Sequence, residues 1–198
     1  MENKYKNSKQ VELFDSKEDF SIGSLKEQNV IQAGKSITEW RDKIYHHQSN
    51  ILKSLNNSSL QQQIIPETDQ DNIKKINPFL YESFSINFWR TNKKIHHGPA
   101  MYFVFDKFEE YQIILYIGET LSADKRWKGV HDCKFYIQNY KEELAKNHLD
   151  SHLDIRFYFD VPKAVNLRRK LEQKLIYLWL PPFNKETKNR WTTTFTNN

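Results

Sequence analysis

Two apolar runs separated by a short charged stretch place the strongest constraint on how this chain can fold. Residues 100–105 read AMYFVF and residues 113–117 read IILYI, so both runs consist of aromatic, β-branched and other apolar side chains. Such residues are enriched in β-strands, and the segment DKFEEYQ between them is long enough to reverse the chain. The sequence therefore predicts an antiparallel hairpin centred on Glu109.

Four further segments have the pattern of regular structure. Residues 153–159, LDIRFYF, are typical of a third strand, and apolar residues recur at helical spacing after Asp132 and after Pro162. A shorter helix is predicted from Ser122 to Gly129. The order strand, strand, helix, helix, strand, helix predicts a small α+β domain with a three-stranded, mostly antiparallel sheet flanked by helices.

We expect four parts along the chain: a disordered N-terminus (1–35), a helical extension with a linker (36–97), the α+β domain (98–190) and a C-terminal tail (191–198). The N-terminus is polar and without pattern. The extension begins with SITE, a capping-box sequence that starts at Ser36, and this predicts an amphipathic helix over about 37–55. Asn, Gln and Ser dominate the linker after it.

Composition narrows the class of protein. No apolar run approaches the roughly 18 residues of a membrane span, and the N-terminal residues lack the apolar core of a signal peptide. Cys133 is the single cysteine, which excludes a disulfide framework. We therefore expect a cytoplasmic protein with no membrane partner. The net charge is +5, and eight lysine and arginine residues against two glutamates lie within 163–190, which favours a nucleic-acid partner.

Two tyrosines stand in the predicted hairpin. A hairpin centred on Glu109 places Tyr102 opposite Tyr116, and both phenols then point to one face of the sheet. Gly118, two residues after Tyr116, keeps the backbone bare at the end of the second strand. An aromatic pair that only stabilises the sheet is the structural alternative.

Three polar residues elsewhere are also candidates. Glu172 lies on the apolar face of the last predicted helix, where a carboxylate needs a metal ion or an ion-pair partner. The alternative is a salt bridge to Arg168 or Arg169, one turn back. Arg126 alone is typical of a solvated helix position, and Asn184, after two prolines, of a turn.

In this order the residues resemble the GIY-YIG nuclease family. AMY stands in the place of the first signature, and YIG, residues 116–118, matches the second. ADKRWKGVH resembles the helix that carries the family arginine, KLEQKL the glutamate helix and PPFN the asparagine segment. The resemblance covers residues 98–190 and is strongest to compact bacterial members related to the restriction-endonuclease branch.

The resemblance implies hydrolysis of phosphodiester bonds in double-stranded DNA with Mg²⁺, or Mn²⁺ as the alternative metal. It gives Tyr102 the deprotonation of water and Glu172 the metal, with Arg126 stabilising the phosphate. The residues expected to be catalytic are Tyr102, Tyr116, Arg126, His131, Glu172 and Asn184, and those expected to contact nucleic acid are Gly118, Lys125, Lys128, Arg168 and Lys185.

Two departures from the family pattern leave an alternative open. Ala100 replaces the glycine of the first signature, and His131 follows Arg126 by five residues where some members have a histidine after four. A catalytically inactive nucleic-acid-binding module that keeps the fold is therefore the alternative, and a structural protein with aromatic strands is a third hypothesis. The oligomeric state is open between monomer and homodimer.

Overall fold

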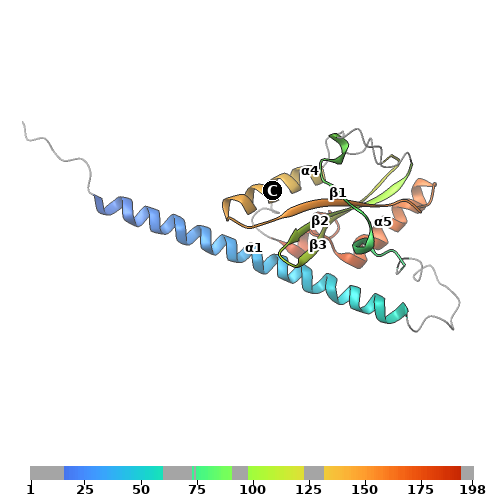
Figure 1. Ribbon diagram of the computed structural model, residues 1–198, viewed down its shortest axis with the longest axis horizontal. Coiled ribbons are helices and arrows are strands. Elements are labelled where there is room, and N and C mark those ends of the chain that lie inside the picture. Colours follow the sequence, from blue (N-terminus) through green and yellow to red (C-terminus); the bar gives the residue numbers. More distant parts are fainter. Residues whose placement is uncertain (1–15, 60–72, 74, 91–97, 123–131, 193–198) are drawn as a thin grey trace, which may run out of the picture.

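The computed structural model describes residues 16–59, 73, 75–90, 98–122 and 132–192 (Figure 1). Helices and strands follow the order α1 (Ser16–Ser59), η1 (Pro78–Leu80), β1 (Ser83–Ser85), η2 (Phe88–Arg90), β2 (Ala100–Phe108), β3 (Tyr111–Thr120), α4 (Asp132–Lys146), β4 (His152–Tyr158), α5 (Val165–Trp179) and η3 (Lys188–Trp191). Within these ranges, no helix combines the length and apolar character needed to cross a membrane. The helix predicted between Ser122 and Gly129 lies largely outside the described residues.

The protein is an α+β domain with a four-stranded sheet. The strand order is β1-β4-β2-β3, and every neighbouring pair is antiparallel. The prediction of three strands was therefore one strand short, because β1 has only three residues, too few to show an alternating pattern. The central position of β2 explains its run of apolar residues, since both of its faces are covered.

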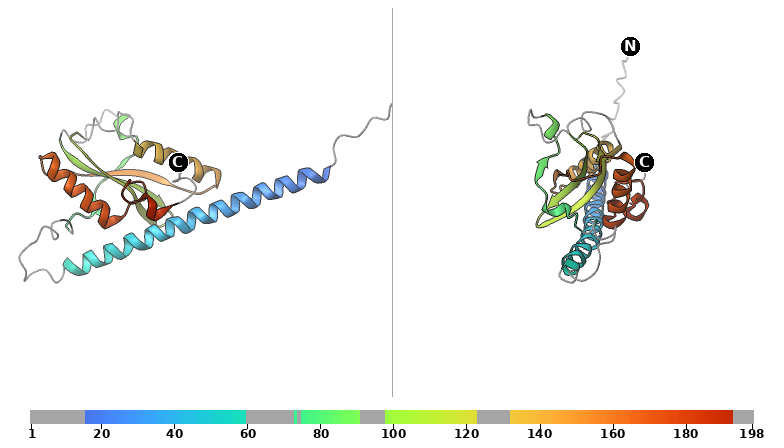
Figure 2. Two further views of the ribbon diagram at one scale, coloured as in Figure 1. Left: turned by 180° about the vertical axis from the view of Figure 1, so that it is seen from behind. Right: turned by 90° about the vertical axis from the view of Figure 1, so that its right-hand side faces the viewer.

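The N-terminal helix begins at Ser16, twenty-one residues before the predicted start at about residue 37. Ser36 to Glu39 lie inside it, so the capping-box interpretation was wrong: Thr38 Oγ1 donates to the Gly34 carbonyl at 3.1 Å, one turn back in an unbroken helix. The helix includes residues 16–35, for which we expected disorder, while residues 1–15 lie outside the described part. Its first half projects beyond the rest of the molecule (Figures 1 and 2).

The second half of α1 is part of the domain core. Ile37, Trp40 and Ile44 are buried against the sheet. The Gln48 amide bonds to the outer edge of β3, donating to the Ile114 carbonyl at 3.0 Å and accepting from the Ile114 N–H at 2.8 Å. This helix therefore docks on the α+β domain.

The sheet has two covered faces, which we name the α4 face and the α5 face. The buried core of the α4 face includes Tyr102, Val104, Ile113 and Leu115 with Ile137 and Tyr140 of α4. That of the α5 face includes Met101, Phe103, Phe105 and Ile114 with Leu175, Ile176 and Trp179 of α5. Figure 2 shows α5 on one side of the sheet. Helix α1 passes along the edge of the sheet that β3 forms, where Gln48 binds.

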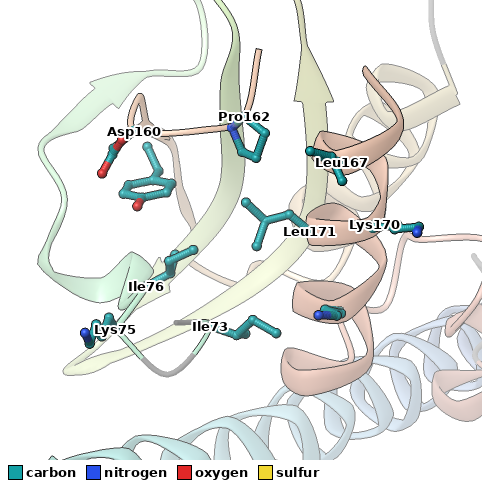
Figure 3. A pocket seen from close by; sticks show the side chains of 10 residues that line it. Ile73, Lys75, Ile76, Asp160, Pro162, Leu167, Lys170 and Leu171 are labelled. Carbon is teal, nitrogen blue, oxygen red and sulfur yellow. The ribbon is translucent and has the colours of Figure 1, made fainter. Parts of the chain in front are cut away.

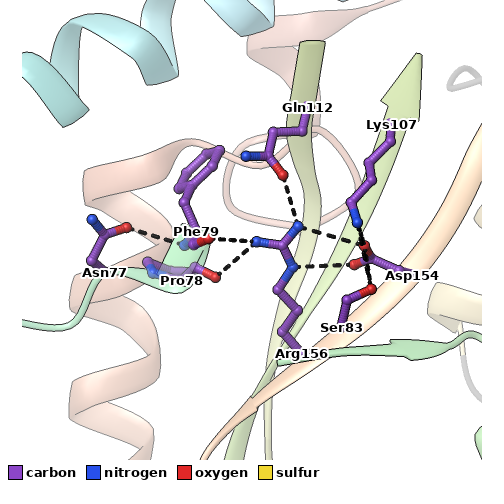
Figure 4. A network of polar contacts seen from close by, with 8 residues as sticks. All are labelled: Asn77, Pro78, Phe79, Ser83, Lys107, Gln112, Asp154 and Arg156. Atoms are coloured by element: carbon purple, nitrogen blue, oxygen red, sulfur yellow. Dashed lines mark hydrogen bonds and ion pairs between the residues drawn. The ribbon is translucent and has the colours of Figure 1, made fainter. Parts of the chain in front are cut away.

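A polar network closes the α5 face beside η1 (Figure 4). Arg156 of β4 is buried, and its guanidinium donates to the Phe79 carbonyl at 2.9 Å and to Gln112 Oε1 at 2.7 Å. Asp154, two residues earlier on β4, pairs with Lys107 Nζ at 2.7 Å and with Arg156 Nε at 3.3 Å. The buried charges are thus paired, as a low-dielectric site requires.

Candidate functional site

The two tyrosines of the hairpin lie on one face of the sheet, as predicted, but in a different register. Tyr102 pairs with Gly118, and Tyr116 pairs with Val104, so the expected direct pairing of the two tyrosines was wrong. Their rings stack diagonally with centroids 5.9 Å apart and planes inclined by 24°. The stack lies on the α4 face at the end of β3.

A β-bulge makes this arrangement possible. Near the turn, Phe108 pairs with Tyr111 and Phe105 with Ile114, but the register shifts between Val104 and Phe105, so that β3 holds one extra residue, Leu115. Side chains alternate along a strand, and without the extra residue Tyr116 would point to the α5 face, away from Tyr102.

Gly118 is required by the Tyr102 ring. A Cβ at Gly118 would lie 2.8 Å from Tyr102 Cε1 and closer still to Cζ and the hydroxyl oxygen. No side chain fits there without moving the ring. We had expected the bare backbone to let a DNA phosphate approach, whereas the close neighbour in the structure is Tyr102 itself.

Glu172 reaches the same end of β3 from α5. Its Oε1 accepts a hydrogen bond from the backbone N–H of Glu119 at 3.0 Å. The Glu119 side chain in turn pairs with Arg168 Nε at 2.6 Å and lies 3.7 Å from Arg169 Nε. Both arginines therefore pair with Glu119.

Arg168 is fully buried. Besides Glu119, its Nη1 donates to the carbonyls of Pro162 and Lys163, both at 3.1 Å. These contacts hold the chain that leads into α5, whose N-cap, Ala164, provides no side-chain cap. We had expected Arg168 to contact nucleic acid, but the structure places its guanidinium in the interior, where it fixes α5 to β3.

Asn184 binds the edge of β3 through its side-chain amide. Its Oδ1 accepts from the Ile117 N–H at 2.9 Å, and its Nδ2 donates to the Ile117 carbonyl at 2.8 Å. The Phe183 N–H also donates to the Leu115 carbonyl at 3.0 Å. The segment after Pro181-Pro182 therefore acts as a short substitute for a further strand, and Lys185 next to it is exposed.

The Tyr116 phenol is held in its neutral form. Burial raises its pKa well above the usual value of a tyrosine, and the neighbouring Tyr102, Cys133 and Glu172 raise it further. The contribution from Glu172 means that this carboxylate lies within electrostatic range of the phenol. At neutral pH, Tyr116 is thus a hydrogen-bond donor rather than a base.

The remaining predicted site residues lie outside the described residues. These are Lys125, Arg126, Lys128 and His131. Their segment starts immediately after Ser122, two residues beyond the end of β3, and ends before α4. Cys133, at the start of α4, is among the groups that raise the Tyr116 pKa, so the beginning of this helix lies within electrostatic range of the phenol.

The described part of the chain can offer a metal ion one anchored carboxylate. It contains no group of three or more His, Cys, Asp or Glu side chains that could enclose a metal. Mg²⁺ needs no such enclosure, since it is commonly held by one or two carboxylates with water and phosphate oxygens. Glu172, fixed by the Glu119 N–H, fits that mode of binding.

Sequence reasoning missed Glu119 and Gln48. Glu119 carries the pair with Arg168, and Gln48 covers the Ile114 backbone from a helix that we had placed outside the domain. A glutamate directly after Tyr-Ile-Gly was visible in the sequence, but its partner is 49 residues away.

No protein-family model matches the chain, and neither a curated protein nor a solved structure matches it significantly.

Proposed function

We propose that this protein is a metal-dependent DNA endonuclease of the GIY-YIG type, which hydrolyses phosphodiester bonds in double-stranded DNA. The observation that carries the proposal is the stacked pair Tyr102 and Tyr116 with the Glu172 carboxylate anchored at the same end of β3. Asn184 on the Ile117 backbone is a further support, since it holds the edge of the strand that carries Tyr116.

The different exposure of the two tyrosines supports different roles for them in the proposed reaction. Tyr102 is fully buried and Tyr116 is half-buried. We therefore assign to Tyr116, the less buried of the two, the positioning of a phosphate oxygen and a water molecule by donation from its neutral hydroxyl. Tyr102 supports the Tyr116 ring from behind; as the base that we expected, it would need a substrate-bound state in which water reaches it.

Glu172 is the residue that would hold Mg²⁺, or Mn²⁺ in its place. When bound, the metal would neutralise charge on the scissile phosphate and on the leaving oxygen. The chain supplies the rest: the Glu119 N–H orients the carboxylate, and the Arg168 pair keeps Glu119 in place. Arg126 is our proposed cation for the charge that develops on the phosphate.

Glu172→Gln tests the proposal, because it keeps the shape and removes the charge. Nicking of supercoiled plasmid DNA with Mg²⁺ should fall by about a hundredfold, as expected when an electrostatic contributor to the transition state is lost. Binding of duplex DNA in a gel-shift assay should persist and weaken steeply with added salt, since phosphate contacts release counterions. Glu110→Gln, an exposed glutamate in the hairpin turn, is the matched control and should nick like the wild type.

Other outcomes separate the alternatives. Salt-sensitive DNA binding by a wild type that never nicks DNA with Mg²⁺ or Mn²⁺ would favour the inactive nucleic-acid-binding module. Absence of both binding and nicking would favour the structural protein. Undiminished nicking by Glu172→Gln would remove Glu172 from the mechanism. Thermal unfolding of the same variant shows whether a loss of nicking reflects chemistry or a loss of folded protein.

A further inference from the structure

A cleft of about 480 Å³ lies on the α5 face, between α5, the end of β4 and the segment before η1 (Figure 3). Tyr158 lines it and pairs across the strands with Met101, whose side chain is on the face opposite to Tyr102. The sheet therefore separates this cleft from the tyrosine stack. Its volume lies within the range of cavities that hold small organic ligands.

The walls of the cleft are aliphatic. Leu167 and Leu171 project from α5, and Ile73 and Ile76 face them from the other side, with Pro162 at one end (Figure 3). Leu167 is 49% exposed, so about half of its surface is open to a ligand in the cleft. Such walls favour the binding of an apolar group, because contact with it removes apolar surface from water.

The rim of the cleft is basic. Lys75, Lys170 and Lys174 line it, and all three are exposed. In Figure 3 the Lys170 side chain extends from α5 on the side opposite to Leu171. Asp160 is the one carboxylate of the lining, so three ammonium groups and one carboxylate give a formal net charge of +2. Lysine ammonium groups sit on flexible stems and can turn toward an anion bound between them.

We propose that this cleft binds a small organic anion, with its apolar body between the leucines and isoleucines and its acidic group held by the lysines of the rim. The Tyr158 hydroxyl on the wall can donate a hydrogen bond to a polar substituent of the same ligand or accept one from it, and the Asp160 carboxylate can accept one. The combination of aliphatic walls with a positive rim selects against neutral apolar molecules and against bare inorganic anions, because each satisfies only half of the site.

The test uses 8-anilinonaphthalene-1-sulfonate, which joins an aromatic body to a sulfonate and fluoresces when it is bound. The wild type should bind it saturably at one site. In the double variant Lys170→Gln/Lys174→Gln the dissociation constant should rise roughly tenfold, from the loss of two exposed charge contacts. The matched control Lys43→Gln/Lys53→Gln removes two exposed lysines of α1, and its dissociation constant should stay within about twofold of the wild type.

A second variant tests the apolar half of the site. Leu167→Gln keeps the charge, and the dissociation constant should rise roughly threefold. Sodium sulfate at the same concentration, which offers only the anionic group, should not displace the dye. Equal weakening in both lysine pairs, unchanged binding in Lys170→Gln/Lys174→Gln, or binding that never saturates would overturn the proposal. Far-UV circular dichroism confirms that each variant is folded, so that a change in affinity reports on the cleft.

Discussion

Gly118 shows how a single residue sets the geometry of the candidate site. The Tyr102 ring lies directly over its Cα, at a distance that leaves no room for a Cβ. Only with glycine at this position can Tyr102 lie flat across β3 and stack on Tyr116. Gly118 is therefore needed because it leaves space for the Tyr102 ring. Its backbone conformation is ordinary, since no glycine among the described residues has a positive φ.

Gly118→Ala should destabilise the protein by about 1–3 kcal/mol, the usual effect of overpacking a filled core. The added methyl group forces the Tyr102 ring to move, because the competing contacts are with Cε1, Cζ and the hydroxyl. Urea unfolding followed by tryptophan fluorescence measures the change. In a Tyr102→Leu background the same substitution should cost close to nothing, and an undiminished cost there would show that the ring is not the cause.

Gly34→Ala is the matched control. Gly34 lies inside α1, and a Cβ there would meet only Asn147 at an ordinary 3.7 Å. Alanine restricts the unfolded chain and favours the helix, so this variant should be more stable than the wild type by about 0.5–1 kcal/mol. The two glycine substitutions are thus expected to change the free energy of unfolding in opposite directions.

At the scale of elements, a buried ion pair joins α1 to the sheet. Arg41 Nη2 lies 3.0 Å from Asp106 Oδ2 of β2, and Arg41 Nε donates to the Tyr140 hydroxyl at 2.7 Å. The Tyr140 and Ser151 hydroxyls donate to the same carboxylate. Burial raises the pKa of Asp106, and Arg41 is the strongest of the groups that lower it again.

Arg41→Met should destabilise the protein by about 3–5 kcal/mol at neutral pH, because it leaves Asp106 charged and buried without its cation. The variant raises the Asp106 pKa further. A raised folded-state pKa favours folding at low pH and is a disadvantage once pH rises through it. The difference between wild type and variant should therefore be largest near neutral pH and shrink as pH falls and Asp106 takes up a proton. Urea unfolding at about pH 7 and about pH 5 measures this change.

Lys146→Met provides the surface comparison. Lys146 Nζ pairs with Glu143 at 2.7 Å on the exposed side of α4. Water screens this pair, so its loss should be small and sensitive to salt, with little dependence on pH over the same range. If Arg41→Met showed an equally small effect, the pair with Asp106 would not be what holds α1 in place.

The elements that could be predicted from the sequence are those defined by local periodicity. The helices after Asp132 and after Pro162 were confirmed within a few residues, and β2, β3 and β4 were found where the apolar runs predicted them. The start of α1 was missed because Ser36 and Glu39 match a cap pattern that also occurs within helices. The register between β2 and β3 was missed because the turn is tight and a β-bulge follows it. The position of the bulge depends on how the two faces of the sheet pack, which no local pattern shows.

The candidate site was predictable to a smaller extent. Side-chain alternation placed Tyr102 and Tyr116 on one face, and the resemblance drew attention to Asn184. The contacts that orient Glu172 span 53 residues, and those of Gln48 span 66, so no local pattern could indicate them. The burial of Arg168 is equally a tertiary property, because a basic residue on an isolated helix is expected to face solvent.

At the scale of the whole molecule, the two halves of α1 should contribute very differently to stability. The first half projects beyond the domain (Figure 1). Among the α1 residues whose side chains the structure describes, the first in the buried core is Ile37. A chain that begins at Gly34 should therefore fold, with a thermal midpoint within about 5 °C of the full-length protein. Thermal unfolding by circular dichroism measures the midpoint.

A chain that begins at Leu60 is the companion experiment. It lacks Trp40, Arg41, Ile44 and Gln48, and so loses core area, an ion pair and the cover of β3. We expect it to show no cooperative transition. A cooperative transition in this shorter chain would mean that α1 is an accessory helix and not a part of the folding unit.

The residues that bind the outer edge of β3 also determine how this molecule can contact other molecules. Gln48, Phe183, Asn184 and Glu172 together make six hydrogen bonds to its outward backbone groups. A strand from a neighbouring chain would have to break these before it could pair there, and the opposite edge, β1, offers only three residues. The outer edge of β3 is thereby protected against edge-to-edge pairing with a strand of another chain, and we expect assembly with a second copy to use helices or loops.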